Sequence, residues 1–154
     1  MKTEESVITQ EMKDAVGVES EPVTHDVEKG AIIKFAQAIG DDNPLFNDEQ
    51  AARQSRYGGM IAPPTFMRSL ISKSPPSFKS PYSAALDGGS EWEYFEPVRP
   101  GDRITVTTKI ADLFERPGRL GNMLFTIRET RYVNQFGKTA ALQRTTGISY
   151  EPAD

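Results

Sequence analysis

Residues 35–48 read FAQAIGDDNPLFND, and this stretch holds the end of a predicted helix and the turn that follows it. Gly40 suits a helix C-terminus, because glycine readily adopts the left-handed conformation that is common there. Asp41, Asn43 and Pro44 favour a turn, since short polar side chains bond nearby backbone groups and proline fixes φ. Taken alone, the run GDDNP predicts a helix C-cap followed by an Asx-type turn.

The helix before this turn is expected over residues 28–39. Its apolar residues follow the i, i+3, i+4, i+7 spacing of one buried stripe: Ile32, Phe35, Ala36 and Ile39. A short extended segment at 23–27 precedes it. Residues 1–20 mix charge with little apolar periodicity, which favours a flexible acidic arm or a marginal helix that pairs with something else. We expect a single globular domain over residues 21–154.

Downstream of the turn, residues 40–60 are rich in cap and turn formers, with a short helical turn expected at 48–54. A second helix is expected from Pro64 to Ile71, because proline pre-sets the first helical turn and apolar residues follow it. The next residues, 72–82, are rich in serine and proline and predict a connecting loop.

From residue 84 onward the pattern is that of strands. Ile104, Val106, Thr108 and Ile110 alternate with polar residues, as in a half-buried strand. A second strand reaches Tyr132, and the sequence NQFG at 134–137 predicts a hairpin to a third. A helical half followed by an antiparallel half predicts an α+β domain in which a helix lies against a sheet.

The composition excludes several classes of protein. The chain has 154 residues, no cysteine and one histidine, His25, which argues against a zinc site, and no carboxylate spacing matches a calcium loop. No apolar run approaches the roughly 20 residues of a membrane span, and the N-terminus does not resemble a signal peptide, so we expect a cytoplasmic protein. Residues 1–28 carry a net charge of −6 and the remaining residues one of +2, which gives −4 for the whole chain. The scattered positive charge elsewhere argues against nucleic acid and suits an anionic small molecule.

Four stretches together resemble MaoC-like dehydratases and (R)-specific enoyl-CoA hydratases. The family pattern Gly-Asp-x-Asn-Pro-Leu/Ile-His-x-Asp aligns with residues 40–48. Further matches are YGGMIAPPTF at 57–66, GGSEWEYFEPVRPGD at 88–102 and TRYVNQFGK at 130–138. The resemblance covers residues 22–152 and is nearer to the N-terminal, non-catalytic type of domain. It implies a hot-dog fold, with a long central helix wrapped by an antiparallel sheet.

The resemblance also implies a site. In the family, an aspartate and a histidine hold the water that adds to an α,β-unsaturated thioester, and positioned acid–base groups contribute about 10² to 10⁴ in rate. Asp41 matches the aspartate and Asn43 the asparagine, whereas Phe46 occupies the histidine position. Phenylalanine cannot transfer a proton, so this half-site cannot perform the reaction alone. The residues implied for acyl-thioester binding are Phe46, Tyr57, Gly59, Pro64, Thr65 and Phe66.

Three functions are consistent with the missing histidine. The chain can be the partner subunit of a heteromeric hydratase, in which a second hot-dog subunit supplies the histidine in a heterodimer or heterotetramer. It can be a homodimeric hydratase that uses Asp41 with Asn47 or Thr65. It can also be a non-enzymatic protein that binds acyl-CoA or another acyl thioester. No cofactor is implied by any of the three. His25 lies outside the motif and is interpreted as a surface or capping residue.

Overall fold

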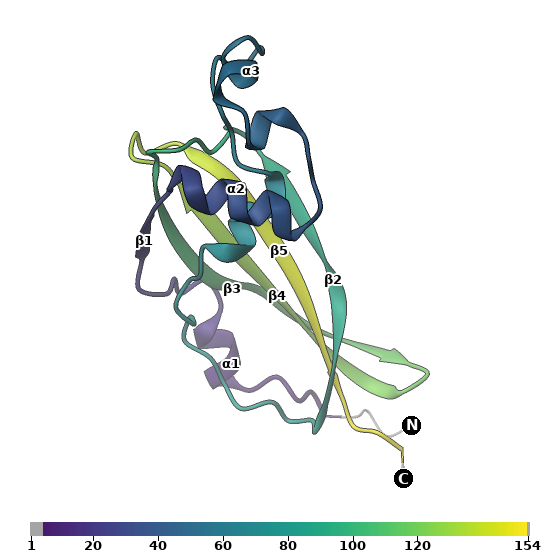
Figure 1. Cartoon of the computed structure of the whole chain (residues 1–154). Coiled ribbons are helices and arrows are strands. Elements are labelled where there is room, and N and C mark those ends of the chain that lie inside the picture. Colours follow the sequence, from purple (N-terminus) through teal and green to yellow (C-terminus); the bar gives the residue numbers. More distant parts are fainter. Residues whose placement is uncertain (1–4, 154) are drawn as a thin grey trace.

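The chain folds into one curved antiparallel sheet with short helices gathered mainly at one end (Figure 1). The computed structural model describes residues 5–153. The strands are β1 (Val23–Asp26), β2 (Ala84–Tyr94), β3 (Arg103–Gly118), β4 (Gly121–Val133) and β5 (Thr139–Tyr150). The helices are α1 (Gln10–Ala15), α2 (Lys29–Ala38) and α3 (Glu49–Arg53), with two 3₁₀ segments, η1 (Pro44–Phe46) and η2 (Pro64–Ser69). The predicted α+β class is confirmed.

The sheet has the strand order β1-β3-β4-β5-β2, with all neighbours antiparallel. Strands β3, β4 and β5 form the predicted meander, and the hairpin between the last two closes where Gly137 N–H donates to the Asn134 carbonyl at 3.0 Å. Gly137 has φ of +74°, a conformation that glycine adopts without steric cost. The alternation in β3 is also confirmed, because Ile104, Val106 and Ile110 are fully buried.

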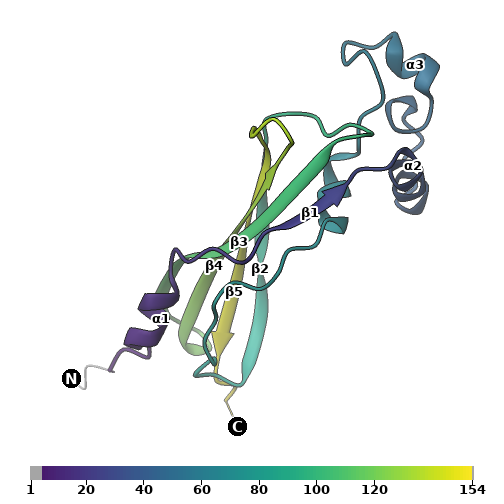
Figure 2. The same ribbon diagram turned by 90° about the vertical axis from the view of Figure 1, so that its left-hand side faces the viewer.

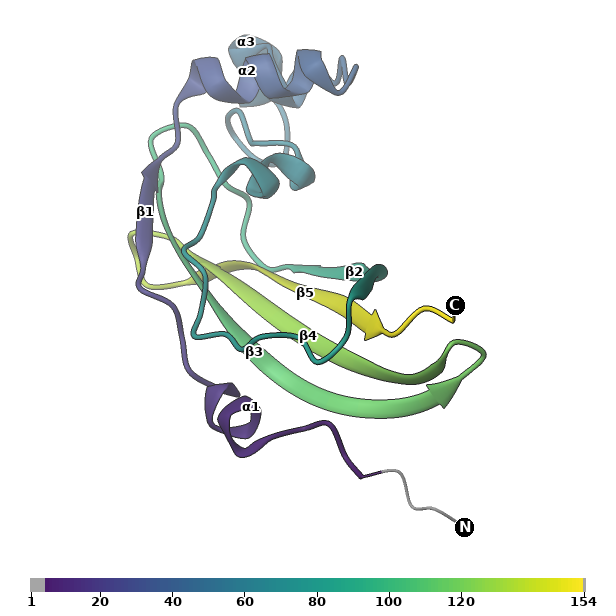
Figure 3. The same cartoon turned by 90° about the horizontal axis from the view of Figure 1, so that it is seen from below.

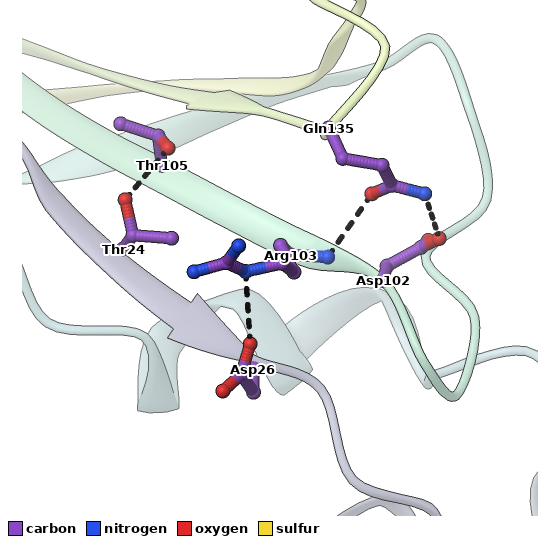
Figure 4. A network of polar contacts seen from close by, with 6 residues as sticks. All are labelled: Thr24, Asp26, Asp102, Arg103, Thr105 and Gln135. Carbon is purple, nitrogen blue, oxygen red and sulfur yellow. Dashed lines mark hydrogen bonds and ion pairs between the residues drawn. The ribbon is translucent and has the colours of Figure 1, made fainter.

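Strand β1 forms one short edge of the sheet by pairing with the start of β3 (Figure 4). Thr24 and Thr105 share a hydroxyl hydrogen bond of 2.9 Å, and Arg103 Nε lies 3.1 Å from Asp26 Oδ1. Gln135 accepts a bond from the Arg103 N–H and donates to Asp102, which ties the β4–β5 hairpin to the same corner. The Asp26–Arg103 ion pair is exposed, so it contributes about 0–1 kcal/mol and mainly helps to set the register.

Helix α2 agrees with its predicted bounds to within one residue. Ile32 and Ala36 are buried, while Phe35 is half-buried against the same core. The expected stripe was wrong at Ile39, which is 49% exposed. Ile39 is the C-cap, and the chain turns away at Gly40, where φ is +70°. The side chain therefore lies past the end of the face that packs on the sheet.

The helix expected from Pro64 to Ile71 is shorter than predicted and has 3₁₀ rather than α-helical geometry. This segment is η2, which has six residues and ends at Ser69. Pro75 and Pro76 follow shortly after, and proline disfavours helical geometry in the residue before it and lacks the N–H that a helix needs. Figures 2 and 3 show the segment after η2 running along the sheet on the same side as α2. The connecting loop predicted at 72–82 therefore covers part of the sheet beyond the end of η2.

The N-terminal segment is packed against β3, which corrects the expectation of a free arm for the described part of residues 1–20. Helix α1 begins at the N-cap Thr9 and buries Met12 and Ala15. Beyond it, Ser20 N–H donates to the Thr108 carbonyl at 2.8 Å, and Thr108 N–H donates to the Ser20 hydroxyl at 3.0 Å. These bonds continue the β1 edge. The described part of this segment contains a short helix packed on β3, and residues 1–4 lie outside the described part.

The main core lies between α2, η2 and the upper half of the sheet. Its buried members come from every layer: Val27, Ile32, Ala36, Phe46, Ala52, Met60, Ile61, Ala62, Phe66, Met67, Leu70, Val98, Ile104, Val106, Tyr132, Ala140 and Ala141. In the described chain no helix has the length and apolar character needed to cross a membrane.

Candidate functional site

The loop from Gly40 to Asn47 is held by its own polar side chains. Asp41 Oδ1 accepts a hydrogen bond from the Asn43 N–H at 3.0 Å, and Asn43 Oδ1 accepts from the Leu45 N–H at 3.1 Å. These are the bonds of an Asx turn and of the N-cap of η1. Both predicted catalytic residues therefore have a turn-forming role in the structure, and Asn43 is exposed while Asp41 is half-buried.

Phe46, which stands at the histidine position of the motif, points into the protein. Its side chain is 5% exposed and belongs to the main core. The Ile61 N–H donates to the Leu45 carbonyl at 3.1 Å, so the residue before Phe46 is tied to the segment that leads into η2. Phe46 thus anchors the loop by apolar packing, a role that does not require a titratable group.

The single histidine does not replace the missing one. His25 lies on β1, and its Nε2 is 2.7 Å from the carbonyl oxygen of Ile71, just after η2. This contact satisfies a carbonyl near the end of a short helix, as the interpretation of a capping residue predicts. Strand β1 is at one edge of the sheet and β2 is at the other. His25 is therefore at the opposite edge of the sheet from β2.

An apolar cavity of about 290 Å³ lies beside η2 and the end of β2. This volume is near the lower limit of typical small-molecule pockets, at about 300 Å³. The Ala62 N–H donates to the Val98 carbonyl at 2.7 Å and holds the two walls together. The cavity is lined by Tyr57, Ile61, Ala62, Pro64, Met67, Tyr94, Phe95, Glu96, Pro97 and Val98.

The residues predicted to bind the acyl thioester are only partly brought together. Tyr57 and Pro64 line the cavity. Phe66 is buried beneath it and packs edge-on against Phe35, with ring centroids 5.6 Å apart. Thr65 is exposed, and a Cβ built at Gly59 would lie 3.7 Å from Arg99 Nη1. Asp41, Asn43 and Phe46 are not among the lining residues.

The start of η2 offers few free backbone donors to a ligand in the cavity. Pro64 has no N–H, and the Phe66 N–H donates to the Pro63 carbonyl at 2.9 Å. A six-residue 3₁₀ segment also sums few peptide dipoles. An oxyanion site of the helix N-terminal kind is therefore not formed by this chain alone.

Sequence reasoning did not identify two polar groups of the cavity, Tyr94 and Glu96. Tyr94 stacks on Trp92 with centroids 5.8 Å apart, and Trp92 stacks on Tyr132 at the same distance. Glu96 Oε1 lies 3.8 Å from Lys138 Nζ. Glu96 is the only carboxylate that lines this cavity. Both residues stand in the stretch GGSEWEYFEPVRPGD, but only the pairing of β2 with β5 shows where they lie.

The phenols near the cavity are donors rather than bases at neutral pH. Burial raises the pKa of Tyr94 above its usual value of 10. Burial also raises the pKa of Tyr132 to about 12, although the positive charge of Arg68 acts in the opposite direction. A neutral tyrosine can donate one hydrogen bond to a carbonyl or hydroxyl oxygen. The cavity can therefore bind and orient a ligand, but its own residues supply no histidine for proton transfer.

No metal site accompanies the cavity. Within residues 5–153, no group of three or more histidine, aspartate or glutamate side chains gathers closely enough to hold an ion.

The curved sheet with its short helices and the apolar cavity define a hot-dog domain of the dehydratase class. The chain belongs to the family described as FAS1-like, dehydratase domain region, whose sequence profile matches residues 14–143. The predicted kinship with MaoC-like dehydratases is confirmed by this match and by a solved MaoC-like dehydratase from Rhodospirillum rubrum. That structure is 25% identical and has a TM-score of 0.71, over 93% of this chain and 98% of that one.

Relatives in actinobacteria are similar over much of the chain. A UPF0336 protein of Streptomyces coelicolor is 36% identical over 110 residues, which are 68% of this chain and 71% of that protein. The match with the Streptomyces avermitilis UPF0336 protein spans only 63% of its length. A probable enoyl-CoA hydratase alpha subunit of Thermomonospora curvata is 25% identical over 137 residues, or 77% of this chain and 43% of that protein.

Two solved complexes from Mycobacterium tuberculosis share the fold. The ChsH1–ChsH2 complex matches with a TM-score of 0.76 at 19% identity, over 88% of this chain and 86% of that one. The HadBC (3R-hydroxyacyl-ACP dehydratase) complex matches with a TM-score of 0.70 at 21% identity, over 88% of this chain and 98% of that one.

Proposed function

We propose that this chain is one subunit of an (R)-specific enoyl-CoA hydratase or 3-hydroxyacyl thioester dehydratase. It forms part of the acyl-thioester pocket beside a second, histidine-bearing hot-dog chain. The observation that carries the proposal is Phe46, which fills the histidine position with a buried apolar ring while the surrounding turn is retained. The chain thus keeps the architecture of the site and lacks the group that moves the proton.

The contribution of this chain is binding and wall formation. An acyl group placed against Met67 and Phe95 would exclude water from apolar surface, worth about 25 cal/mol per Å². Tyr94 can donate a hydrogen bond to an oxygen of the ligand, since its pKa is raised. The Thermomonospora relative, named as the alpha subunit of an enoyl-CoA hydratase, and the HadBC complex, named as a dehydratase, support a hydratase or dehydratase made of two different chains.

The partner is proposed to pair along β2. This strand is an 11-residue edge, whereas the other edge strand, β1, has four residues. A long edge with unpaired backbone groups is a template for another strand. Leu86, Tyr94 and Phe95 lie on or directly after β2 and are 45%, 47% and 54% exposed, so the edge also presents apolar surface.

The test compares the chain alone with the chain mixed with a hot-dog protein that carries the complete Gly-Asp-x-Asn-Pro-x-His motif. Hydration of a short trans-2-enoyl-CoA should be negligible for the chain alone and should rise on mixing. Robust turnover by the chain alone, abolished by Asp41→Asn and kept in the control Asp42→Asn, would instead establish a homodimeric hydratase. A higher melting temperature with acyl-CoA, without turnover in either preparation, would favour a binding protein.

A further inference from the structure

A second cavity, of about 340 Å³, lies between the sheet and the segment that follows η2. It shares no lining residue with the apolar cavity, so it does not depend on the proposed hydratase role. Its floor comes from β3, β4 and β5, and its cover is the segment visible beside the sheet in Figure 3. The lining residues are Ser72, Lys73, Ser74, Pro75, Ser77, Thr108, Arg128, Thr130, Gln143 and Thr145.

The floor of this cavity is polar where a sheet usually packs on an apolar core. The inner face of an antiparallel sheet is normally apolar, and polar residues there are costly unless they are satisfied or functional. Thr108 and Gln143 are 6% and 5% exposed, and they sit on central strands. Register pairing places Thr108 opposite Thr130, and Thr130 opposite Gln143. A continuous row of polar side chains therefore crosses the middle of the sheet.

The hydrogen bonds of this row leave donors unused. Thr108 Oγ1 lies 2.8 Å from Ser72 Oγ and 2.8 Å from Thr130 Oγ1. Three hydroxyls carry three protons and these two bonds use two of them, so one O–H remains free to donate. Gln143 donates one of its two amide protons to the Ser90 hydroxyl at 2.9 Å, which leaves the other. These spare protons are available to donate to a ligand.

Two positive charges line the same cavity. Register pairing places Arg128 opposite Thr145, and a Cβ built at Gly147 would come within 4.0 Å of Arg128 Nη1, so the guanidinium reaches over β5. Among the described residues, neither Arg128 nor Lys73 forms an ion pair or a side-chain hydrogen bond within the chain. Within residues 5–153, no carboxylate lines the cavity. The charge of the site is therefore not neutralised by the protein.

We infer that this cavity binds an oxyanion, the carboxylate or phosphate group of a small molecule. Arg128 supplies a planar fork of donors that fits either group, and Lys73 and the hydroxyl row Ser72–Thr108–Thr130 complete the shell. A hydrocarbon chain is a poor occupant, because it would remove water from these donors without offering an acceptor. The site thus selects for an oxygen-rich, negatively charged group.

The test is a titration of the full-length ¹⁵N-labelled chain with inorganic phosphate and, separately, with glutarate, at constant ionic strength so that screening does not change. The amides of Thr108, Thr130 and Gln143 should shift saturably with at least one of the two anions. Phosphate alone would identify a phosphate group, and glutarate alone a carboxylate. The neutral alcohol hexanol should leave these signals unchanged.

Arg128→Gln should weaken the binding at least about tenfold, since charge-assisted hydrogen bonds are roughly twice as strong as neutral ones. Lys73→Gln should weaken it less, because lysine acts as a point charge without the bidentate fork. Arg119→Gln, in the β3–β4 turn, is the matched control and should leave binding unchanged. The inference is overturned if neither anion saturates, if hexanol shifts the same amides, or if Arg128→Gln binds as the wild type does.

Discussion

Phe46 stands at the histidine position of the motif with a side chain that packs in the core. The turn before it is fixed by Asp41 and Asn43, which bond to backbone N–H groups and need no histidine to do so. The ring itself is 5% exposed and replaces a polar group with apolar contact area. Burial of a phenylalanine contributes about 1.5–3 kcal/mol relative to leaving it exposed. At this position the chain therefore has an apolar packing contact in place of the titratable group of the motif.

The packing role of Phe46 predicts a large effect on stability. Phe46→Ala should lower the free energy of unfolding by about 3–5 kcal/mol, because it removes buried apolar area and leaves a cavity. Phe136→Ala is the control, since that ring is 77% exposed at the β4–β5 turn and should change stability by less than about 0.5 kcal/mol. Urea unfolding monitored by circular dichroism measures both. Equal effects for the two variants would contradict the role given to Phe46.

Tyr132 predicts a loss of stability at alkaline pH. Its folded pKa, raised to about 12 by burial, exceeds the value of 10 expected for an unfolded chain. The unfolded chain therefore releases the proton first, and stability that is intact below pH 10 falls as the pH rises toward 12. The loss should amount to roughly 2 kcal/mol. Unfolding measured between pH 9 and about 11.5 should show a smaller fall for Tyr132→Phe; an identical fall would disprove this assignment.

At the scale of elements, features fixed by local chemistry were predictable. The bounds of α2 follow from its apolar spacing and from Gly40, and the burial of β3 follows from strict alternation. The segment η2 was predicted as a longer α-helix but ends at Ser69 in 3₁₀ geometry, shortly before Pro75 and Pro76, which disfavour helical geometry. The attachment of the segment after α1 to β3 includes bonds between Ser20 and Thr108, which are 88 residues apart. No local pattern encodes such a contact.

In the candidate site too, some residues were predictable from local sequence and others are brought in only by long-range strand pairing. Tyr57 and Pro64 were predicted from the motif and do line the apolar cavity. Tyr94 and Glu96 join them because β2 pairs with β5 and turns there toward Val98, which is a property of topology. The polar row under the second cavity was likewise not predicted, since Thr108 fitted the alternation of an ordinary strand.

The N-terminal segment is held to β3 partly by Glu115, and this contact should be lost in acid. Ser6 Oγ donates to Glu115, and so do the Val7 N–H at 3.1 Å and Asn122 Nδ2 at 2.8 Å. The bond from the Ser6 hydroxyl is the largest cause that lowers the pKa of Glu115 below 4.5. The stabilisation is therefore present above about pH 4.5 and is lost as the pH falls through the lowered folded value.

Hydrogen exchange at the Val7 amide measures this contact. Protection of Val7 should decrease below pH 4.5 in the wild type, and in Glu115→Gln it should be weak throughout the range from pH 3 to 6. Glu19→Gln is the control, because this exposed carboxylate forms no hydrogen bond or ion pair in the described part of the chain. Unchanged protection of Val7 in Glu115→Gln would show that α1 alone holds the segment.

At the scale of the whole molecule, the two cavities and the long free edge β2 all belong to one curved sheet. The apolar cavity opens beside the end of β2, and the polar cavity lies over β3, β4 and β5. Trp92 stands between them in register, opposite Gln143 and two residues before Tyr94. Apolar and oxyanion binding are thereby separated by an aromatic stack of Trp92, Tyr94 and Tyr132. A partner paired along β2 would contact the apolar side of this arrangement.

That placement predicts association through β2. Without the histidine-bearing partner the same edge is free to pair with a second copy, so the chain alone should be a dimer or larger at micromolar concentration by analytical ultracentrifugation, and Leu86→Glu should weaken association at least about tenfold. A charge placed on an edge strand opposes edge-to-edge pairing, and burying it unpaired is costly. Leu120→Glu is a matched control, because both leucines are 45% exposed but Leu120 lies in the β3–β4 turn. A wild-type monomer would contradict the association, while a dimer that Leu86→Glu leaves intact would move the interface away from β2.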